Sequence, residues 1–304
     1  VTNTCFFKKT SQLIMSSDLK HLPVLVDEVI SYLKPQSNKI YFDGTFGQGG
    51  YSKKILSLNS KVIATDRDSI SKNCARELKL KYPKRFFFKI EKFSNIKDIL
   101  KQFDVKKVNG VTLDLGLSSP QIDNSSRGFS FNTDGPLDMR MDNKRKEITA
   151  KEIINEFSES QLSEIFYYYG EEKNSRKIAK LIVLERKKKK IQTTLELSKI
   201  IKKINFYNHK NPSTRVFQAL RIFVNDELNE LEKFLNNCLS FLSKNSRIII
   251  VAFHSLEDRI VKNFFKENIR FLKIITKKPV TPSFEEIKKN PRSKSAKMRV
   301  AEVL

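Results

Sequence analysis

The sequence predicts an α/β fold with a doubly wound parallel sheet and an all-helical insertion. Short apolar runs alternate with amphipathic stretches over the first 115 residues, which is the pattern of strand–helix–strand units. Three of these runs end in an acidic residue, and the first is followed by a glycine-rich turn. The alternation then stops, and only helical patterns occur between residues 149 and 206. We therefore expect one sheet whose strands are separated in the sequence by a helical unit.

The expected elements follow from the spacing of apolar residues and from the turn residues between them. Apolar stripes predict helices at 21–33, 53–58, 69–82 and 96–103, and apolar runs predict strands at 40–42, 61–65, 85–90 and 108–115. Residues 118–142 are rich in Gly, Pro, Asn, Asp and Ser and are typical of a loop. Further helices are expected at 150–156, 160–168, 174–186, 194–204 and 225–242. Strands at 247–253, 271–276 and 298–303 would complete the sheet.

The domain limits follow from this order. Residues 21–140 and 214–304 would form the sheet domain, and residues 141–213 an inserted helical unit for substrate recognition. Residues 1–20 are polar and lack the apolar core of a secretory signal, so we interpret them as a disordered arm or an extension. No stretch approaches the roughly 18–20 apolar residues of a membrane span.

Composition limits the class of function. The formal net charge of +24, from 58 Lys and Arg against 34 Asp and Glu, suits a nucleic-acid partner. The chain is also rich in Lys, Ile, Asn and Phe, which indicates an A/T coding bias that raises the lysine count by itself. The 3 cysteines and 3 histidines are scattered. We therefore expect no disulfide framework, no metal site and a reducing, cytoplasmic compartment.

The glycine-rich turn follows the first predicted strand and begins at Asp43. Its glycines, Gly44, Gly47, Gly49 and Gly50, have the spacing G-x-x-G-x-G-G, and a dinucleotide fingerprint is G-x-G-x-x-G. Asp43 would also repel a pyrophosphate, which disfavours a nicotinamide dehydrogenase. A cationic nucleoside such as S-adenosylmethionine (SAM) suits this turn better. The alternative is a turn that only joins a strand to a helix.

Two more acidic residues end strands of the same predicted sheet. Asp66 ends the second strand, where a carboxylate is placed to accept from ribose hydroxyls, and Asp114 ends the fourth. Ligands of doubly wound sheets bind beyond the carboxyl ends of the strands. Helix capping would explain any one of these acids, but three at three strand ends favour a nucleoside cofactor.

Nine segments of the sequence form a recognisable set. They are HLPVLVDEV from His21, DGTFGQGGYS from Asp43, ATDRD from Ala64, LDLGLSSPQID from Leu113, RGFSFNTDGPLDMRMD from Arg127, YGEE from Tyr169, TRVFQALRIFVNDEL from Thr214, FHSLEDRIVK from Phe253 and NPRSKSAKMRVAE from Asn290. These segments resemble the RsmH (MraW) family of small-subunit ribosomal RNA (cytosine-N4) methyltransferases. They occur in the family's order and span almost the whole chain from His21 to Glu302.

This resemblance implies a Rossmann-like class I SAM-dependent methyltransferase sheet. It implies methyl transfer from SAM to the exocyclic N4 of a cytidine in the decoding region of small-subunit ribosomal RNA. We expect this RNA within the assembled subunit, and free RNA remains the alternative. The implied cofactor contacts are Gly49, Gly50, Tyr51, Asp66, Phe93, Asp114 and Gln121, to which the residues themselves add Asp43 and Gly47. The family usually has His at the position of Tyr51. Monomer and homodimer both remain open.

The catalytic candidates are Asp114, at the end of the fourth strand, and residues that follow the fourth and fifth strands. Many amino-group methyltransferases carry a Ser/Asp/Asn-Pro-Pro-aromatic loop after strand four, and Ser118, Ser119 and Pro120 follow Asp114 at that place without the second Pro or the aromatic ring. His254 is a candidate proton acceptor or RNA contact, and a helix cap is the alternative.

The expected RNA-binding residues are basic or aromatic. Phe129 and Phe131 would supply a stacking surface or, alternatively, a small loop core. The basic candidates are Arg127, Arg215, Arg221, Arg292, Lys294 and Lys297; the segment 259–304 holds 13 Lys and Arg against 4 Asp and Glu, and a second basic run covers residues 186–190. A solvated helix end is the alternative for that run.

Two other functions remain as alternatives. A DNA amino-methyltransferase would keep the chemistry, but the missing Pro-Pro-aromatic loop disfavours it. An inactive RNA-binding assembly factor would have lost its cofactor site, and the retained Asp43, Asp66 and Asp114 disfavour that function.

Overall fold

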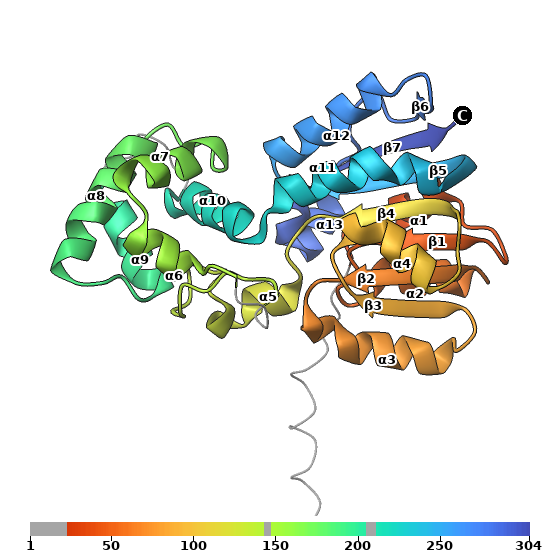
Figure 1. Cartoon of the computed structure of the whole chain (residues 1–304), viewed down its shortest axis with the longest axis horizontal. Coiled ribbons are helices and arrows are strands. Elements are labelled where there is room, and N and C mark those ends of the chain that lie inside the picture. Colours follow the sequence, from red (N-terminus) through yellow and green to blue (C-terminus); the bar gives the residue numbers. More distant parts are fainter. Residues whose placement is uncertain (1–22, 143–146, 205–210) are drawn as a thin grey trace, which may run out of the picture.

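The computed structural model describes residues 23–142, 147–204 and 211–304. Figure 1 shows two lobes, one built around a sheet and one built of helices. They are joined through α5 (Ser119–Asp123) and through the segment formed by α10 (Ser213–Asn225) and α11 (Glu227–Cys238). The predicted arm at residues 1–20 lies outside the described residues. None of the described helices is both long enough and apolar enough to cross a bilayer.

Seven strands form one sheet in the order β3-β2-β1-β4-β5-β7-β6. They are β1 (Ile40–Asp43), β2 (Lys61–Asp66), β3 (Phe86–Ile90), β4 (Val108–Asp114), β5 (Leu242–Ala252), β6 (Leu272–Ile274) and β7 (Lys297–Val303). The first five pair in parallel, and β7 is antiparallel to both of its neighbours. The strand order reverses between β1 and β4, which places a ligand crevice at their carboxyl ends. The predicted doubly wound α/β sheet is confirmed.

Both faces of the sheet are covered by helices, which is why its central strands are apolar throughout. Tyr41 and Val62 point into one core, and Phe42 and Ile63 into the other. The first core is covered by α1 (Val26–Leu33), α2 (Gly50–Ser57) and α3 (Lys72–Lys81). The second is covered by α4 (Ile96–Gln102), α11 (Glu227–Cys238) and α12 (Ser255–Glu267).

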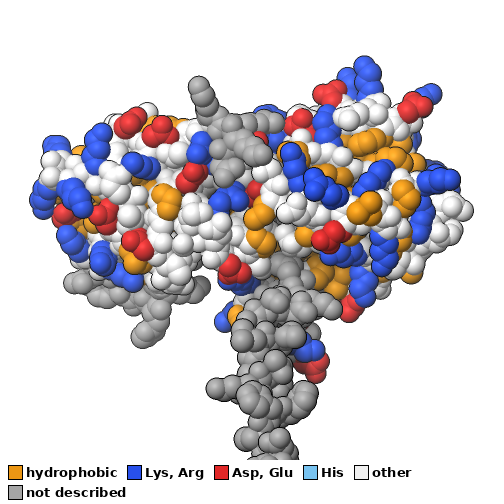
Figure 2. Space-filling model, turned by 90° about the horizontal axis from the view of Figure 1, so that it is seen from below, with side chains coloured by type: hydrophobic (Ala, Val, Ile, Leu, Met, Phe, Trp, Pro, Cys, Tyr) orange, Lys and Arg blue, Asp and Glu red, His pale blue; other side chains and the backbone are white. Residues whose placement is uncertain are grey.

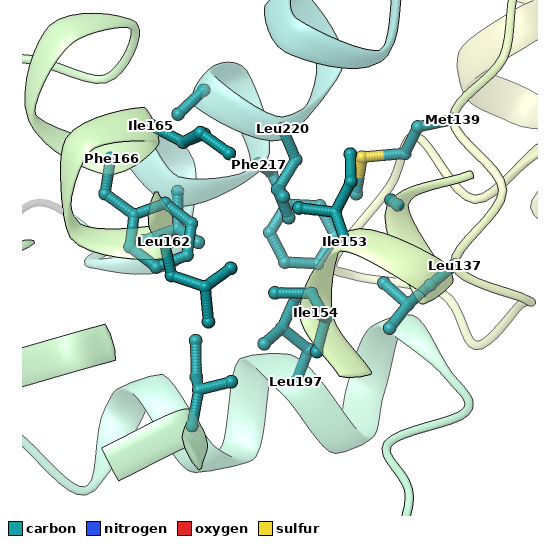
Figure 3. Packing of buried hydrophobic residues seen from close by; sticks show 14 of the residues in the cluster. Leu137, Met139, Ile153, Ile154, Leu162, Ile165, Phe166, Leu197, Phe217 and Leu220 are labelled. Atoms are coloured by element: carbon teal, nitrogen blue, oxygen red, sulfur yellow. The ribbon is translucent and has the colours of Figure 1, made fainter. Parts of the chain in front are cut away.

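The helical lobe contains α6 (Ala150–Glu156), α7 (Glu159–Tyr168), α8 (Ser175–Lys188), α9 (Thr194–Lys202) and α10 (Ser213–Asn225). Capping boxes at Thr149, Ser158 and Thr193 satisfy free N–H groups at the starts of α6, α7 and α9. Figure 3 shows apolar side chains from α6, α7, α9 and α10, among them Ile154, Leu162 and Leu220, gathered into one core.

Helix α10 was not predicted, and it changes the extent of the helical core. Val216, Phe217 and Leu220 are buried in that core, and so is Phe129 from the tract predicted as a loop. The core therefore includes residues before 141 and after 213, the predicted limits of the helical unit. The sequence of α10 does not reveal this, because the packing of α10 depends on contacts with distant segments. The domain limits themselves stay a prediction.

Other boundaries differ for local reasons. Helix α2 begins at Gly50, three residues earlier than expected, because Gly49 adopts a left-handed conformation (φ 76°) that turns the chain directly into the helix. The predicted helix at 225–242 is wrong at both ends: Asp226 (φ 51°) separates α10 from α11, and β5 already begins at Leu242. The tract 118–142 is mainly loop and contains α5 (Ser119–Asp123). The remaining short elements are α13 (Phe284–Lys289), η1 (Ser69–Ser71), η2 (Phe93–Asn95), η3 (Ser125–Arg127), η4 (Leu239–Phe241) and η5 (Pro291–Ser295).

Candidate functional site

A cavity lies beyond the carboxyl ends of β1, β2 and β4. Its empty volume, open mouth included, is about 1120 Å³, and Asp43, Asp66 and Asp114 all line it. The structure therefore brings together three acids that lie up to 71 residues apart in the sequence. The predicted site residues Gly47, Gly50, Tyr51, Phe93, Ser118 and Gln121 also line this cavity. Gly49 caps α2 and does not line it, and neither do Ser119 and Pro120.

The glycine-rich turn is tied to the three acids by short hydrogen bonds. The Gly47 N–H donates to Asp66 Oδ2 at 2.6 Å, and the Ser52 hydroxyl donates to Asp43 Oδ2 at 2.6 Å. The backbone N–H of Asp114 donates to the Thr45 hydroxyl at 2.6 Å. The turn is thus held in one conformation, with the carboxylates already oriented.

The electrostatics of the cavity favour a cation. Burial raises the pKa of Asp43 and of Asp66 to about 6 and that of Asp114 to about 7. Asp114 Oδ1 is buried and has no hydrogen-bond partner among the described residues. Seven acidic side chains line the cavity against two basic ones, Arg67 and Lys92, and Lys92 is already paired with Glu230 at 3.6 Å. A positive ligand would relieve the repulsion among these acids.

These features fit SAM. The sulfonium and the ammonium of SAM supply the positive charge that the buried carboxylates lack. Phe93, half-buried and packed edge-on against Phe234 at a centroid distance of 5.6 Å, lines the cavity with an apolar ring suited to adenine. Tyr51 also lines the cavity, but its hydroxyl donates to the Val24 carbonyl at 2.6 Å. That hydroxyl is therefore committed to the protein.

Asp68 is a site residue that the sequence analysis did not single out. It caps η1, accepting from the Ile70 N–H. Its Oδ2 accepts from Gln121 Nε2 at 2.8 Å and lies 2.9 Å from an Arg127 nitrogen. Asp68 thus connects the end of β2 to the tract that leads into the helical lobe.

Arg127 was expected to contact RNA, and the structure places it elsewhere. It is 8% exposed. Besides Asp68, its guanidinium donates to the carbonyls of Arg140 and Met141 at 2.9 Å each. All three contacts are made by Nη2, and through them Arg127 connects the end of β2 to the tract that leads into the helical lobe.

A second cavity lies between the lobes and adjoins the first. Gly116 and Leu117 line both cavities. The second is lined by aromatic and basic side chains, among them Phe129, Phe131, Phe217, Arg221, Phe253, His254 and Arg292. Phe131 packs edge-on against Phe217 at 5.3 Å, so the RGFSF phenylalanines serve both as a loop core and as a cavity wall.

His254 caps α12. Its Nδ1 accepts from the Glu257 N–H at 3.4 Å, as the capping alternative predicted, and its Nε2 lies 3.1 Å from Glu257 Oε1. Arg221 pairs with Glu227 at 2.8 Å, and Glu227 lines the first cavity. Glu227 was not predicted as a site residue. In the sequence, Glu227 is marked only by its place in TRVFQALRIFVNDEL, one of the segments that resemble the family.

The other basic candidates lie nearer the surface. Arg292 is exposed and pairs with Asp123 at 2.5 Å, Lys294 is exposed, and Lys297 lies 3.8 Å from Asp258. Arg215 donates to the Glu171 carbonyl at 3.1 Å. In the basic run, Arg186 donates to the carbonyls of Ile154 and Phe157 at the end of α6, whereas residues 187–190 are exposed. Figure 2 shows Lys and Arg side chains distributed over both lobes on the face that it presents.

Comparisons with known proteins agree with this site. The model of the MraW methylase family matches residues 18–304. Proteins named ribosomal RNA small subunit methyltransferase H are similar over almost their whole length. The one from Wolbachia sp. subsp. Drosophila simulans (strain wRi) is 47% identical and covers 94% of this chain and 100% of its own. The one from Ehrlichia canis (strain Jake) is 48% identical and covers 92% of this chain and 98% of its own. The one from Halothermothrix orenii is 45% identical and covers 93% of this chain and 98% of its own.

A solved rRNA methylase from Streptococcus thermophilus is a more distant likeness. It has a TM-score of 0.40 and 9% identity, with 92% of this chain and 93% of that chain covered. The match to the family model extends over both lobes and every strand of the sheet. The chain therefore belongs to the MraW methylase family.

Proposed function

We propose that this protein transfers a methyl group from SAM to the exocyclic N4 of a cytidine in small-subunit ribosomal RNA. The observation that carries the proposal is the pairing of two adjoining cavities. One is acidic and large enough for a nucleoside cofactor, and the other is aromatic and basic. The names of the similar proteins, and the formal net charge of +24, support an RNA substrate.

The three strand-end carboxylates would hold the cofactor. Asp66 accepts one backbone N–H on each oxygen, from Gly47 and from Asp68. Each oxygen keeps a further lone pair, which suits the two ribose hydroxyls. Asp114, with its unpartnered Oδ1, faces the same cavity and would attract the cationic end of the ligand.

The second cavity would hold the target base after the base has left its stack in the RNA. The cytosine amino group is a weak nucleophile, because its lone pair is delocalised into the ring. SAM bound in the first cavity would supply the methyl group, its sulfur keeping the electron pair of the C–S bond, and the methylated nitrogen would release one proton to water. The protein contributes orientation, since Gly116 and Leu117 form a wall common to both cavities, and aromatic rings onto which the base can stack.

We propose the assembled small subunit, in the cytoplasm, as the substrate. The test is transfer of labelled methyl from SAM to purified small subunits that lack this modification, followed by nucleoside analysis. Label in N4-methylcytidine is expected. Label that appears only with a DNA substrate would establish a DNA methyltransferase. SAM binding without transfer to any nucleic acid would indicate an inactive binding protein.

Neutralising Arg292 and Lys294 together, as the double alanine variant, is expected to weaken subunit binding. Both are exposed, and Arg292 lines the second cavity. Each lost phosphate contact lowers the slope of log K against log salt by about one unit. The measurement is subunit affinity at several salt concentrations.

The matched control is the double variant Lys106→Ala/Lys107→Ala, which removes the same charge at the opposite end of β4. It should leave the salt slope unchanged. Equal slopes in all three proteins would show that the basic tail does not contact RNA.

A further inference from the structure

Three side chains meet where the two cavities adjoin. Arg221 lies near the end of α10, Glu227 begins α11, and His254 caps α12. Glu227 lines the acidic cavity, whereas Arg221 and His254 line the aromatic one. Glu227 pairs with Arg221, and a His254 ring nitrogen lies within 4.8 Å of a Glu227 carboxylate oxygen, so the three side chains form one group.

Each of these side chains keeps one polar atom without a hydrogen-bond partner among the described residues. The atoms are Arg221 Nε, Glu227 Oε1 and His254 Nε2. The side chains are only 13%, 8% and 7% exposed. Native structures satisfy nearly all buried polar atoms, because each unsatisfied one costs free energy. Three such atoms at one junction indicate a polar ligand.

The hydrogen-bonding character of the three atoms follows from their surroundings. Arg221 Nε carries a hydrogen and only donates, and Glu227 Oε1, in the carboxyl group paired with Arg221, is the acceptor. His254 Nδ1 accepts the helix-capping hydrogen bond, so the neutral ring carries its hydrogen on Nε2. Glu257 is near that hydrogen, at 3.1 Å from Nε2, but without the angle of a hydrogen bond. The junction therefore offers two donors and one acceptor.

This set complements the Watson–Crick edge of cytosine. Cytosine presents an amino donor at N4 and acceptors at N3 and O2, whereas uracil presents an acceptor at position 4 and a donor at N3. We propose that Glu227 Oε1 accepts from the N4 amino group, while Arg221 Nε and His254 Nε2 donate to N3 and O2. The inference rests on the proposed function and specifies how its target base is selected.

The positions of the three residues agree with the direction of transfer. Glu227 lines the cofactor cavity, so an amino group bonded to it faces the methyl donor. Arg221 and His254 line the aromatic cavity, so the rest of the ring would lie among Phe131, Phe217 and Phe253. A uracil in the same place would set its O4 against the Glu227 carboxylate, which is repulsive.

The same residues also bring Glu227, His254 and Glu257 within the spacing of metal ligands. Two observations favour the base over a cation. The Arg221 guanidinium already lies 2.8 Å from Glu227, and the capping bond leaves His254 Nε2 protonated and unable to bind a metal. A divalent cation is therefore an outcome to be tested against the base.

The first test uses Arg221→Lys and His254→Asn in the full chain. Lysine keeps the charge next to Glu227 but lacks Nε, and asparagine keeps an acceptor for the cap but is too short to place a donor where His254 Nε2 lies. Each variant should lower kcat/KM for unmodified subunits about tenfold or more, with unchanged SAM affinity by calorimetry and an unchanged unfolding temperature. Wild-type kcat/KM in both folded variants would overturn the inference, provided that the wild type is active. An inactive wild type would instead refute the proposed function.

The second test is independent of turnover. CMP and UMP binding to the full chain, saturated with S-adenosylhomocysteine, is compared by ligand-detected NMR. CMP should bind more tightly than UMP, and Glu227→Gln should abolish the difference, because a glutamine amide can also donate to uracil O4. Equal binding of CMP and UMP, or no CMP binding, in the wild type would overturn the inference. So would loss of methylation on chelation that is restored by Zn²⁺ or Mg²⁺, which would assign these residues to a cation.

Discussion

Asp114→Asn is expected to weaken SAM binding about 10- to 150-fold while the fold is kept. The substitution preserves the shape of a side chain that is buried against the glycine-rich turn, but it removes the charge that attracts the cationic ligand. A lost charge-assisted hydrogen bond is worth about 1.5–3 kcal/mol. Calorimetry at pH 8 measures the effect. The matched control is Asp98→Asn, an exposed acid on α4, which should bind SAM like the wild type.

The same residue predicts the pH dependence of binding. Burial raises the pKa of Asp114 to about 7, so in the SAM-free protein the carboxyl is largely protonated below that pH. Deprotonation creates the attracting charge, and SAM affinity should therefore rise from pH 6 to 8 and then level off. Asp114→Asn should show a flatter profile, to which Asp43 and Asp66 contribute only near pH 6. An equally steep pH profile in the variant would show that the Asp114 carboxylate does not contribute to SAM binding.

Arg127→Ala is expected to destabilise the protein by about 3–5 kcal/mol, the usual cost of breaking a buried ion pair. Asp68, 3% exposed, would lose its ionic partner, and the carbonyls of Arg140 and Met141 would lose their donor. Urea unfolding gives the change in the free energy of unfolding. The control is Arg215→Ala, at an exposed arginine, with an expected change of no more than about 1 kcal/mol.

A double-mutant cycle separates the ion pair from other effects of Arg127. The variant Asp68→Ala/Arg127→Ala should lose less stability than the sum of the two single variants, because the double variant leaves no unpaired buried charge. Additive losses would show that Arg127 acts through its carbonyl contacts alone.

Local features of the sequence are enough to predict the sheet and the position of the cofactor crevice. Strand ends and turns are local features, so the pattern of residues is enough to place Asp43, Asp66 and Asp114 at one edge of the sheet. Parallel pairing forces the carboxyl ends of such strands together, and the cavity lies where that rule puts it. The segments that resemble the family also indicate the reaction, because they include the three acids and the glycine-rich turn.

The contacts of the residues between the lobes depend on how the two lobes pack against each other. Arg127 resembled an RNA-binding arginine in the sequence, and its burial against Asp68 depends on a contact across 59 residues. Helix α10 and the residues Arg221, Glu227 and His254 were not recognised as one group for the same reason. Hydrogen bonds between distant segments depend on how whole lobes pack, and no local pattern of apolar and polar residues specifies that packing.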